Sequence, residues 1–269
     1  MAHPLPPLVA LWWRAIDDYT TLLEQLSPED WRRPTDLAGW DVFCVAAHVA
    51  HLEAMQAGNP HEETEIGEPP HVRGLMGTFT EQGVVARRDR TPDELITETR
   101  SCATTRHTQL LAEAPTDGTV AAPGVFGLIG WNLEQLLRNR PLDVWMHEQD
   151  IRRATDRRGN LESPAAVHTA DYLAESLGFV LAKRVGAPAG TTVVLEVAGH
   201  PAYAAEVGED GRGRMLPESP DQPRARLATS RETFVLLAGG RRPELADTVS
   251  ISGDEELGRA IVANLAVTP

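Results

Sequence analysis

Cysteine and basic residues are scarce in this sequence, and each shortage excludes a class of protein. Only two cysteines occur in 269 residues, Cys44 and Cys102, and no CxxC pair is present, which excludes a disulfide framework and a cysteine-rich zinc finger. The 25 basic residues stand against 39 acidic ones, giving a formal net charge of -14. Binding to nucleic-acid phosphates or to an anionic membrane surface needs a basic face, so we expect neither partner.

Targeting signals and several common catalytic motifs are also missing. The longest apolar run, around residues 125–131, is too short and too rich in glycine to span a bilayer. Residues 1–7 include three prolines where a signal peptide needs a basic run and an apolar core, so we expect a cytoplasmic protein. The lack of a nucleotide-binding GxGxxG, a P-loop and a GxSxG elbow argues against nucleotide-driven chemistry and serine hydrolysis.

The first part of the chain contains four long helical patterns. Apolar residues recur with a helical period over residues 8–26, and further helices are expected at 41–57, 91–113 and 132–154. Between the second and third helices we expect a loop at 61–77, a length typical of lids and binding loops, followed by a short helix at 80–88. Four long helices predict an antiparallel bundle, in which facing side chains build metal sites.

The pattern changes near residue 160, where a second domain of the α+β class is expected. A helix over 163–185 is followed by alternating and β-branched segments that predict strands, the first two joined as a hairpin. The expected strands lie at 191–198, 203–207, 223–229 and 248–251, and further helices at 231–237 and 254–265. The predicted domains are therefore residues 1–158 and residues 159–269.

A possible metal site is found within the predicted bundle. Asp143 and His147 lie four residues apart in the fourth helix, so both side chains lie on one face and can reach one ion. The best third ligand is His48 in the second helix. By spacing alone, His51 on the same face and Cys44 one turn earlier remain open as ligands. Three protein ligands would leave zinc an open position, which is typical of a catalytic site.

These residues also have an ordinary structural interpretation. A single histidine in an amphipathic helix is usually only a packing or solvent-edge residue. Asp143 and Asp150, together with Arg152 and Arg153, fit a plain salt-bridge face at helical spacing. The histidine-bearing second helix favours the metal site, and Asp150 would then hold an imidazole N–H.

Several motifs, taken in order, resemble one known family. Gly39-Trp40 is followed eight residues later by His48, and then by Arg140-x-x-Asp143-Val-Trp-x-His147-Glu-Gln-Asp-Ile-Arg152. The segment from Phe79 to Arg90 and the tail from Ile251 fit the same family. The chain resembles, over nearly its whole length, the mycothiol-dependent maleylpyruvate isomerase-like family of the DinB superfamily.

The resemblance implies a fold and a set of ligands. The fold is a DinB-like metal-binding four-helix bundle followed by a small sterol-carrier-protein-like α+β domain. The divalent metal, usually zinc, would be held by His48, Asp143 and His147, and the family's isomerase has glutamate at the position of Asp143. An arginine of its second domain helps to hold the substrate, and Arg241, with Arg242 beside it, is the nearest candidate here.

The implied function is a zinc-dependent enzyme that uses mycothiol as thiol cofactor or co-substrate. It would catalyse cis–trans isomerisation or S-transfer on an electrophilic small molecule, as a monomer or homodimer. His51 is our candidate for moving protons, with Glu148 as the alternative, and Arg87 and Arg88 would contact the thiol or the substrate. A zinc hydrolase of an amide or ester and a non-catalytic small-molecule binding protein are the alternative functions.

Overall fold

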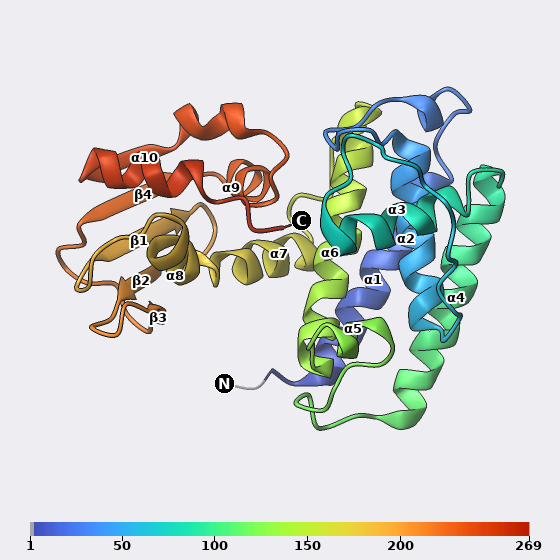
Figure 1. Ribbon diagram of the computed structural model, residues 1–269, viewed down its shortest axis with the longest axis horizontal. Coiled ribbons are helices and arrows are strands. Elements are labelled where there is room, and N and C mark those ends of the chain that lie inside the picture. Colours follow the sequence, from blue (N-terminus) through green and yellow to red (C-terminus); the bar gives the residue numbers. More distant parts are fainter. Residues whose placement is uncertain (1–2, 269) are drawn as a thin grey trace. The chain divides into compact units, whose positions relative to one another are not determined.

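The computed structural model describes residues 3–268, and the chain divides after residue 165 into two compact units. The division lies a few residues beyond the boundary expected at residue 158. The N-terminal unit is helical, and the C-terminal unit combines a sheet with helices (Figure 1). The predicted fold class, a helical bundle followed by a small α+β domain, is therefore confirmed.

Four long helices build the N-terminal unit: α1 (Leu5–Leu23), α2 (Val42–Gln56), α4 (Pro92–Glu113) and α6 (Leu133–Ala154). Helices α1 and α2 each pack against both α4 and α6, so the four helices close a bundle. All four expected helices are present, with ends that differ by a few residues from the prediction. The fully buried core draws on all four helices and includes Trp12, Tyr19, Val49, Leu95 and Leu136.

Side-chain caps fix where the helices of the bundle begin. Asp41 precedes α2 and accepts the backbone N–H of Cys44 at 2.9 Å. Asn132 and Gln135 form a reciprocal capping box at the start of α6, as a threonine and a glutamate do at the start of α4. Such caps satisfy backbone N–H groups that have no partner within the helix. They help to set the register of the side chains on α2 and α6.

The segment between α2 and α4 differs from the prediction. We expected a loop over 61–77 and a helix over 80–88, whereas α3 spans Gly74–Val85. Three glycines, poor helix formers, hide this helix from the sequence pattern, and its packing against α2 compensates for their low propensity. Residues 57–73, here named the strap, form neither helix nor strand and run back along α2 (Figure 1). A further short helix, α5 (Val125–Leu128), lies between α4 and α6.

The C-terminal unit is built around a five-stranded sheet of order β3-β2-β1-β4-β5. Strands β1 and β4 are parallel neighbours, and the other pairs are antiparallel. The strands are β1 (Thr192–Val197), β2 (Tyr203–Val207), β3 (Gly213–Leu216), β4 (Ala225–Thr229) and β5 (Ser250–Gly253). The hairpin of β1 and β2 is present as expected, whereas the short β3 was not predicted.

The helices of the C-terminal unit depart from the prediction at one point. The single helix expected over 163–185 is divided into α7 (Pro164–Ala174), α8 (Leu177–Phe179) and a π-helical turn, η2 (Val180–Arg184). At the break the Ser176 hydroxyl donates to the carbonyl of Leu173, a local bond that competes with helix continuation.

The remaining helical elements complete this unit. They are α9 (Arg231–Ala238), the 3-10 helix η3 (Pro243–Thr248) and α10 (Glu255–Ala263). Helix α8 packs on β2 and β3, and α10 packs on β4 and β5. Across residues 3–268, every helix is too short or too polar to cross a bilayer.

Candidate metal centre

Three side chains expected to bind a metal lie together in the N-terminal unit. His48 comes from α2, and Asp143 and His147 come from successive turns of α6. One donor atom of each lies within 4.8 Å of the donor atoms of the other two. Asp143 Oδ1 is 3.9 Å from His48 Nε2 and 3.6 Å from His147 Nε2. This is the one such group of histidine, cysteine, aspartate or glutamate side chains among residues 3–268.

The packing of α2 against α6 accounts for the group. The i, i+4 spacing puts Asp143 above His147 on one face of α6, and the His48 ring meets that face. The two imidazole rings contact edge to face, with centroids 4.8 Å apart. Both histidines are almost completely buried, whereas the Asp143 side chain is 20% exposed. The group is therefore open to solvent on the side of Asp143.

A buried arginine orients the aspartate. Arg140 donates from Nη1 to Asp143 Oδ2 at 2.8 Å and from Nη2 to Glu53 Oε1 at 2.6 Å, and Trp12 Nε1 also donates to Glu53. With Oδ2 engaged, Oδ1 is the oxygen near the two imidazoles. Burial raises the pKa of a carboxyl group, but Arg140 and His147 hold the pKa of Asp143 well below its ordinary value. Asp143 is therefore ionised, as a metal ligand must be.

The two histidines are held in different ways. His147 Nδ1 lies 3.1 Å from Asp150 Oδ2, so a proton on Nδ1 leaves Nε2 as the acceptor facing the group. Burial lowers the pKa of His147, but Asp143 and Asp150 outweigh burial and raise it above the ordinary value. Burial lowers the pKa of His48, whose Nδ1 is buried without a hydrogen-bond partner.

These donor atoms fit a divalent metal ion. Two imidazole nitrogens and one ionised carboxylate form a common ligand set for catalytic zinc. Two atoms each about 2.1 Å from one ion in tetrahedral geometry lie about 3.4 Å apart. The separations of 3.6 and 3.9 Å in the structure are close to that value. The same set of donors also suits other first-row metals such as Fe²⁺.

The other residues considered as ligands lie outside this group. His51 is fully buried, with Nε2 3.1 Å from His61 Nδ1 and a ring that packs against Gly83 of α3. Burial lowers the pKa of His51 to about 3, so the ring is neutral at neutral pH. Burial likewise raises the pKa of Cys44 to about 12, which keeps its thiol protonated. The role of His51 in moving protons stays a prediction.

The arginines expected to contact the thiol differ in their surroundings. Arg87 is buried and donates to Glu62 of the strap at 3.1 Å, to Glu98 of α4 at 2.7 Å and to the Gly83 carbonyl at 3.0 Å. It therefore ties the strap to the bundle, while Arg88 beside it is exposed. Contact of either arginine with a ligand stays a prediction.

The alternative proton carrier, Glu148, is also tied into structural contacts. It is fully buried, accepts from Arg152 Nε at 2.6 Å and accepts from Asn160 Nδ2. The bond to Arg152 lies within α6, and the bond to Asn160 fastens α6 to the chain that follows it. Glu148 lies outside the group of three donors.

Arg241 lies in the C-terminal unit, after α9. Its guanidinium donates to the Gly239 carbonyl at 2.6 Å and to the Thr268 hydroxyl at 3.2 Å, which ties the end of the chain to the turn after α9. Its predicted contact with a substrate stays a prediction.

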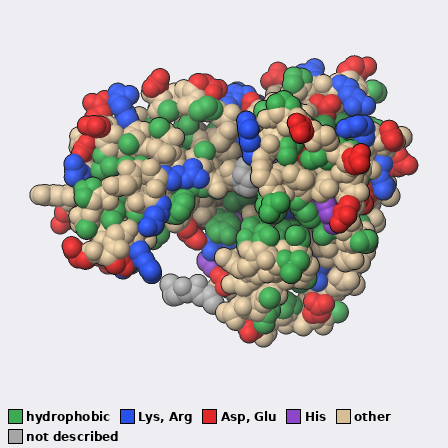
Figure 2. Space-filling view, in the orientation of Figure 1, with side chains coloured by type: hydrophobic (Ala, Val, Ile, Leu, Met, Phe, Trp, Pro, Cys, Tyr) green, Lys and Arg blue, Asp and Glu red, His purple; other side chains and the backbone are tan. Residues whose placement is uncertain are grey.

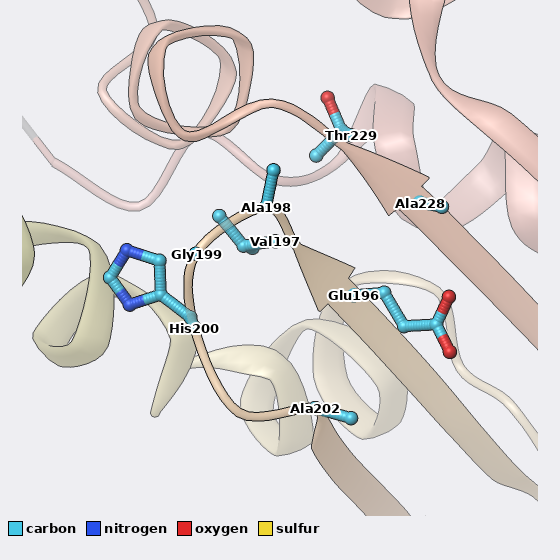
Figure 3. Close-up of a pocket in the computed structure, with 8 residues that line it drawn as sticks. All are labelled: Glu196, Val197, Ala198, Gly199, His200, Ala202, Ala228 and Thr229. Atoms are coloured by element: carbon cyan, nitrogen blue, oxygen red, sulfur yellow. The ribbon is translucent and has the colours of Figure 1, made fainter.

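An open pocket of about 420 Å³ lies in the C-terminal unit at the ends of β1 and β4 (Figure 3). One of its lining residues, His200, lies 2.7 Å from Asp171 through Nδ1 and accepts from Arg231 Nε at 2.6 Å. Both ring nitrogens of His200 are thus engaged within the protein. The pocket is lined by Glu196, Val197, Ala198, Gly199, His200, Ala202, Ala228 and Thr229.

A helical bundle with a buried group of two histidines and one carboxylate, followed by a small α+β domain, defines a two-domain protein with a candidate metal centre. The family described as mycothiol maleylpyruvate isomerase N-terminal domain matches residues 12–152, and its C-terminal counterpart matches residues 168–260. The chain therefore belongs to the mycothiol maleylpyruvate isomerase family.

Solved structures show the same fold. A crystal structure of a mycothiol-dependent maleylpyruvate isomerase carrying a histidine-to-alanine mutation has a TM-score of 0.55 and 17% sequence identity, and the match covers 93% of each chain. A second structure of mycothiol-dependent maleylpyruvate isomerase gives a TM-score of 0.54 at 18% identity, covering 89% of this chain and 90% of the other. None of the curated proteins matches the chain.

Two residues that support the group were missed by sequence reasoning. Glu53 interrupts an apolar stretch of α2, a signal that could have marked it as a buried ion-pair partner. Glu81 of α3 accepts from Trp40 Nε1 at 2.8 Å, and the indole of Trp40 packs on the ring of His48. Glu81 gave no such signal, because its partner lies far away in the sequence.

Proposed function

We propose that the protein is a metal-dependent enzyme that uses mycothiol to isomerise a conjugated double bond in a small electrophilic acid. The group of His48, Asp143 and His147 carries this proposal, because its three donor atoms could hold a metal ion in a chain that belongs to this isomerase family. Zinc is the metal we propose first, since the donor set is typical of catalytic zinc.

A divalent metal bound here would lower the pKa of a thiol that coordinates it, so that a thiolate forms near neutral pH. The protein's own contribution is to hold the ligands ready. Arg140 keeps Asp143 ionised and turned toward the two imidazoles, and Asp150 sets the tautomer of His147. The exposed side of Asp143 leaves a path by which thiol and substrate can reach the site.

General thiol chemistry links this site to isomerisation. Addition of a thiol to a conjugated double bond gives a single bond, which can rotate before the thiol is expelled. Expulsion completes a cis–trans isomerisation, and retention of the thiol is S-transfer. Aspartate in place of the glutamate of the family's isomerase alters the reach of the carboxylate by one methylene group, so we propose enones and enoyl acids as the substrate class rather than maleylpyruvate alone.

Further roles follow from the same proposal. Arg241 would hold a carboxylate of the substrate, and Arg88, the exposed arginine of its pair, would contact the sugars of the thiol. Acidic and basic side chains are interspersed on the face drawn in Figure 2, which suits small-molecule partners better than nucleic acid. The cytoplasmic location stays a prediction.

Turnover with and without the thiol tests the proposal. The zinc-loaded protein is mixed with maleylpyruvate or a cis-enoyl acid, and the cis and trans isomers are separated after incubation with mycothiol, with cysteine or with no thiol. We expect turnover with mycothiol that is lost in His147→Ala. Hydrolysis of esters or amides without thiol would favour a zinc hydrolase, and tight ligand binding without turnover would favour a binding protein.

A further inference from the structure

One of the proposed metal ligands lacks the support that such histidines usually have. A metal-binding histidine almost always donates its second ring N–H to a carboxylate, carbonyl or water, which fixes the ring. His147 has this partner in Asp150, whereas His48 Nδ1 is buried without one. The ring of His48 is therefore not fixed by a hydrogen bond at Nδ1, and its packing contacts bear on how it is held.

The indole of Trp40 lies against that ring. The two ring centroids are 5.1 Å apart, with an interplanar angle of 42°, and Trp40 directly precedes the cap of α2. The His48 ring also contacts the His147 ring, at 4.8 Å between centroids and with an interplanar angle of 76°. The buried imidazole thus packs against an indole and against the other histidine, and these contacts restrict its rotation.

Trp40 is itself fixed by a buried carboxylate. Glu81 of α3 is 8% exposed and accepts the indole N–H at 2.8 Å through Oε2. The same oxygen lies 3.1 Å from Nε2 of His71 in the strap. Glu81 therefore joins the indole beside His48 to α3 and to the strap.

The glycine before Trp40 completes this arrangement. Gly39 has a φ of +81°, and a Cβ atom at this position would lie 2.2 Å from Nδ1 of His71. Only glycine allows the His71 ring to lie so close to the backbone beside Trp40. The two residues of the Gly39-Trp40 pair thus have distinct structural roles. Gly39 leaves room for His71 of the strap, and Trp40 contacts His48.

We propose that Trp40 and Glu81 are positioning residues for His48: the indole takes the place of the missing hydrogen bond at His48 Nδ1, and Glu81 holds the indole. This inference rests on the proposed metal centre. Loss of the indole would free the imidazole to adopt other rotamers, so the bound metal would have to order it. Loss of Glu81 would release the indole of Trp40 and so would also weaken the hold on the His48 ring.

Metal affinity measured by competition with a chromogenic chelator tests the proposal, with Zn²⁺ and Co²⁺ as the probes. Trp40→Leu and Glu81→Leu should each raise the Kd by about tenfold to a hundredfold, the usual effect of losing support for a metal ligand. Glu81→Gln retains an acceptor for the indole and should stay within about threefold of wild type, a change of under 1 kcal/mol.

Trp131→Leu is the matched control. Trp131 is a partly buried tryptophan of the same unit that stacks on Phe126, with centroids 5.7 Å apart, rather than on a proposed ligand. Its loss should leave metal affinity unchanged. The visible absorption of bound Co²⁺, which reports ligand geometry, should change in Trp40→Leu and remain as in wild type in Trp131→Leu. Circular dichroism establishes that each metal-free variant is folded.

The outcomes separate this inference from the proposed function. Equal affinity and equal Co²⁺ spectra in wild type and Trp40→Leu would overturn the positioning role and leave the metal centre standing. An equal loss in Trp131→Leu would also overturn it, because the effect would then be general destabilisation. A wild type that binds neither metal would overturn the metal centre and the positioning role together.

Discussion

Replacing Arg140 by methionine should strongly destabilise the N-terminal unit. The Arg140 side chain is 1% exposed and donates to Glu53, which is fully buried, and to Asp143. Methionine fills a similar volume but leaves the Glu53 carboxylate buried without a counter-charge. Removing one partner of a buried ion pair costs about 3–5 kcal/mol, a large part of the roughly 5–15 kcal/mol that stabilises a typical domain.

A double variant separates the lost charge pair from the lost side-chain packing. Glu53→Gln alone leaves Arg140 without its full counter-charge, but the glutamine can still accept the Trp12 N–H. The double variant Glu53→Gln/Arg140→Met has neither the carboxylate nor the guanidinium charge at these buried positions. The double variant should therefore be more stable than the sum of the single effects predicts, by about 1–3 kcal/mol.

Urea unfolding followed by tryptophan fluorescence measures these free energies. All six tryptophans lie between residues 12 and 145, so the signal reports on the N-terminal unit alone. The experiment uses metal-free protein at pH 7, so that loss of metal does not contribute. A cost below about 1 kcal/mol for Arg140→Met, or strict additivity in the double variant, would refute the reasoning.

Three further predictions concern the residues around the candidate centre. His51 binds its proton near pH 6.5 in the unfolded chain and only near about 3 in the folded protein, so the wild type should lose about 1.4 kcal/mol of stability per pH unit on acidification across that window. His51→Leu should lack this loss. Equal slopes of unfolding free energy against pH for the two proteins, measured by urea unfolding, would contradict the prediction. Asp150→Ala, which removes the partner of His147 Nδ1, should weaken zinc binding about tenfold to a hundredfold in chelator competition, and unchanged affinity would count against that role. Gly83→Ala places a Cβ 2.1 Å from His51 Nδ1 and should lower the unfolding free energy, measured in urea, by about 1–3 kcal/mol. The control Gly77→Ala lies in the same helix with its nearest neighbour at 3.5 Å, so it should be neutral or stabilising. Equal effects of the two substitutions would argue against the clash.

The bundle could be predicted because its signals are local. Helical periodicity and capping residues identify the four long helices, and the spacing of Asp143 and His147 places both side chains on one face. Most of the loop expected at 61–77 is present as the strap, but the start of α3 at Gly74 could not be predicted in the same way. The glycines of α3 carry little periodic signal, and this helix is held by its packing on α2.

The choice between His48 and His51 shows what spacing leaves open. The two residues are three positions apart on α2, so the sequence pattern treats them alike. Tertiary packing separates them: the His48 ring meets His147 of α6, whereas the His51 ring meets His61 of the strap and Gly83 of α3. The angle at which helices cross decides this, and no local pattern encodes it.

The supporting contacts were the hardest to foresee. Glu53 and Arg140 are 87 residues apart, and Trp40 and Glu81 are 41 apart. Taken singly in the sequence, each member of such a pair looks like a common charged or core residue, and nothing nearby in the chain points to its partner. Arg87 illustrates the same limit, since it was expected to contact a ligand and its guanidinium is bonded to Glu62 and Glu98.

Metal content by mass spectrometry tests the central claim most directly. Wild type, His48→Ala and His147→Ala are purified in parallel with His107→Ala, a control residue whose ring stacks on Trp13 and which is not one of the three donors. About one divalent metal per chain in wild type and His107→Ala, and none in the other two, is the result that three protein ligands predict. Wild type that binds no metal even after incubation with zinc, or His48→Ala and His147→Ala that retain it, would contradict the account.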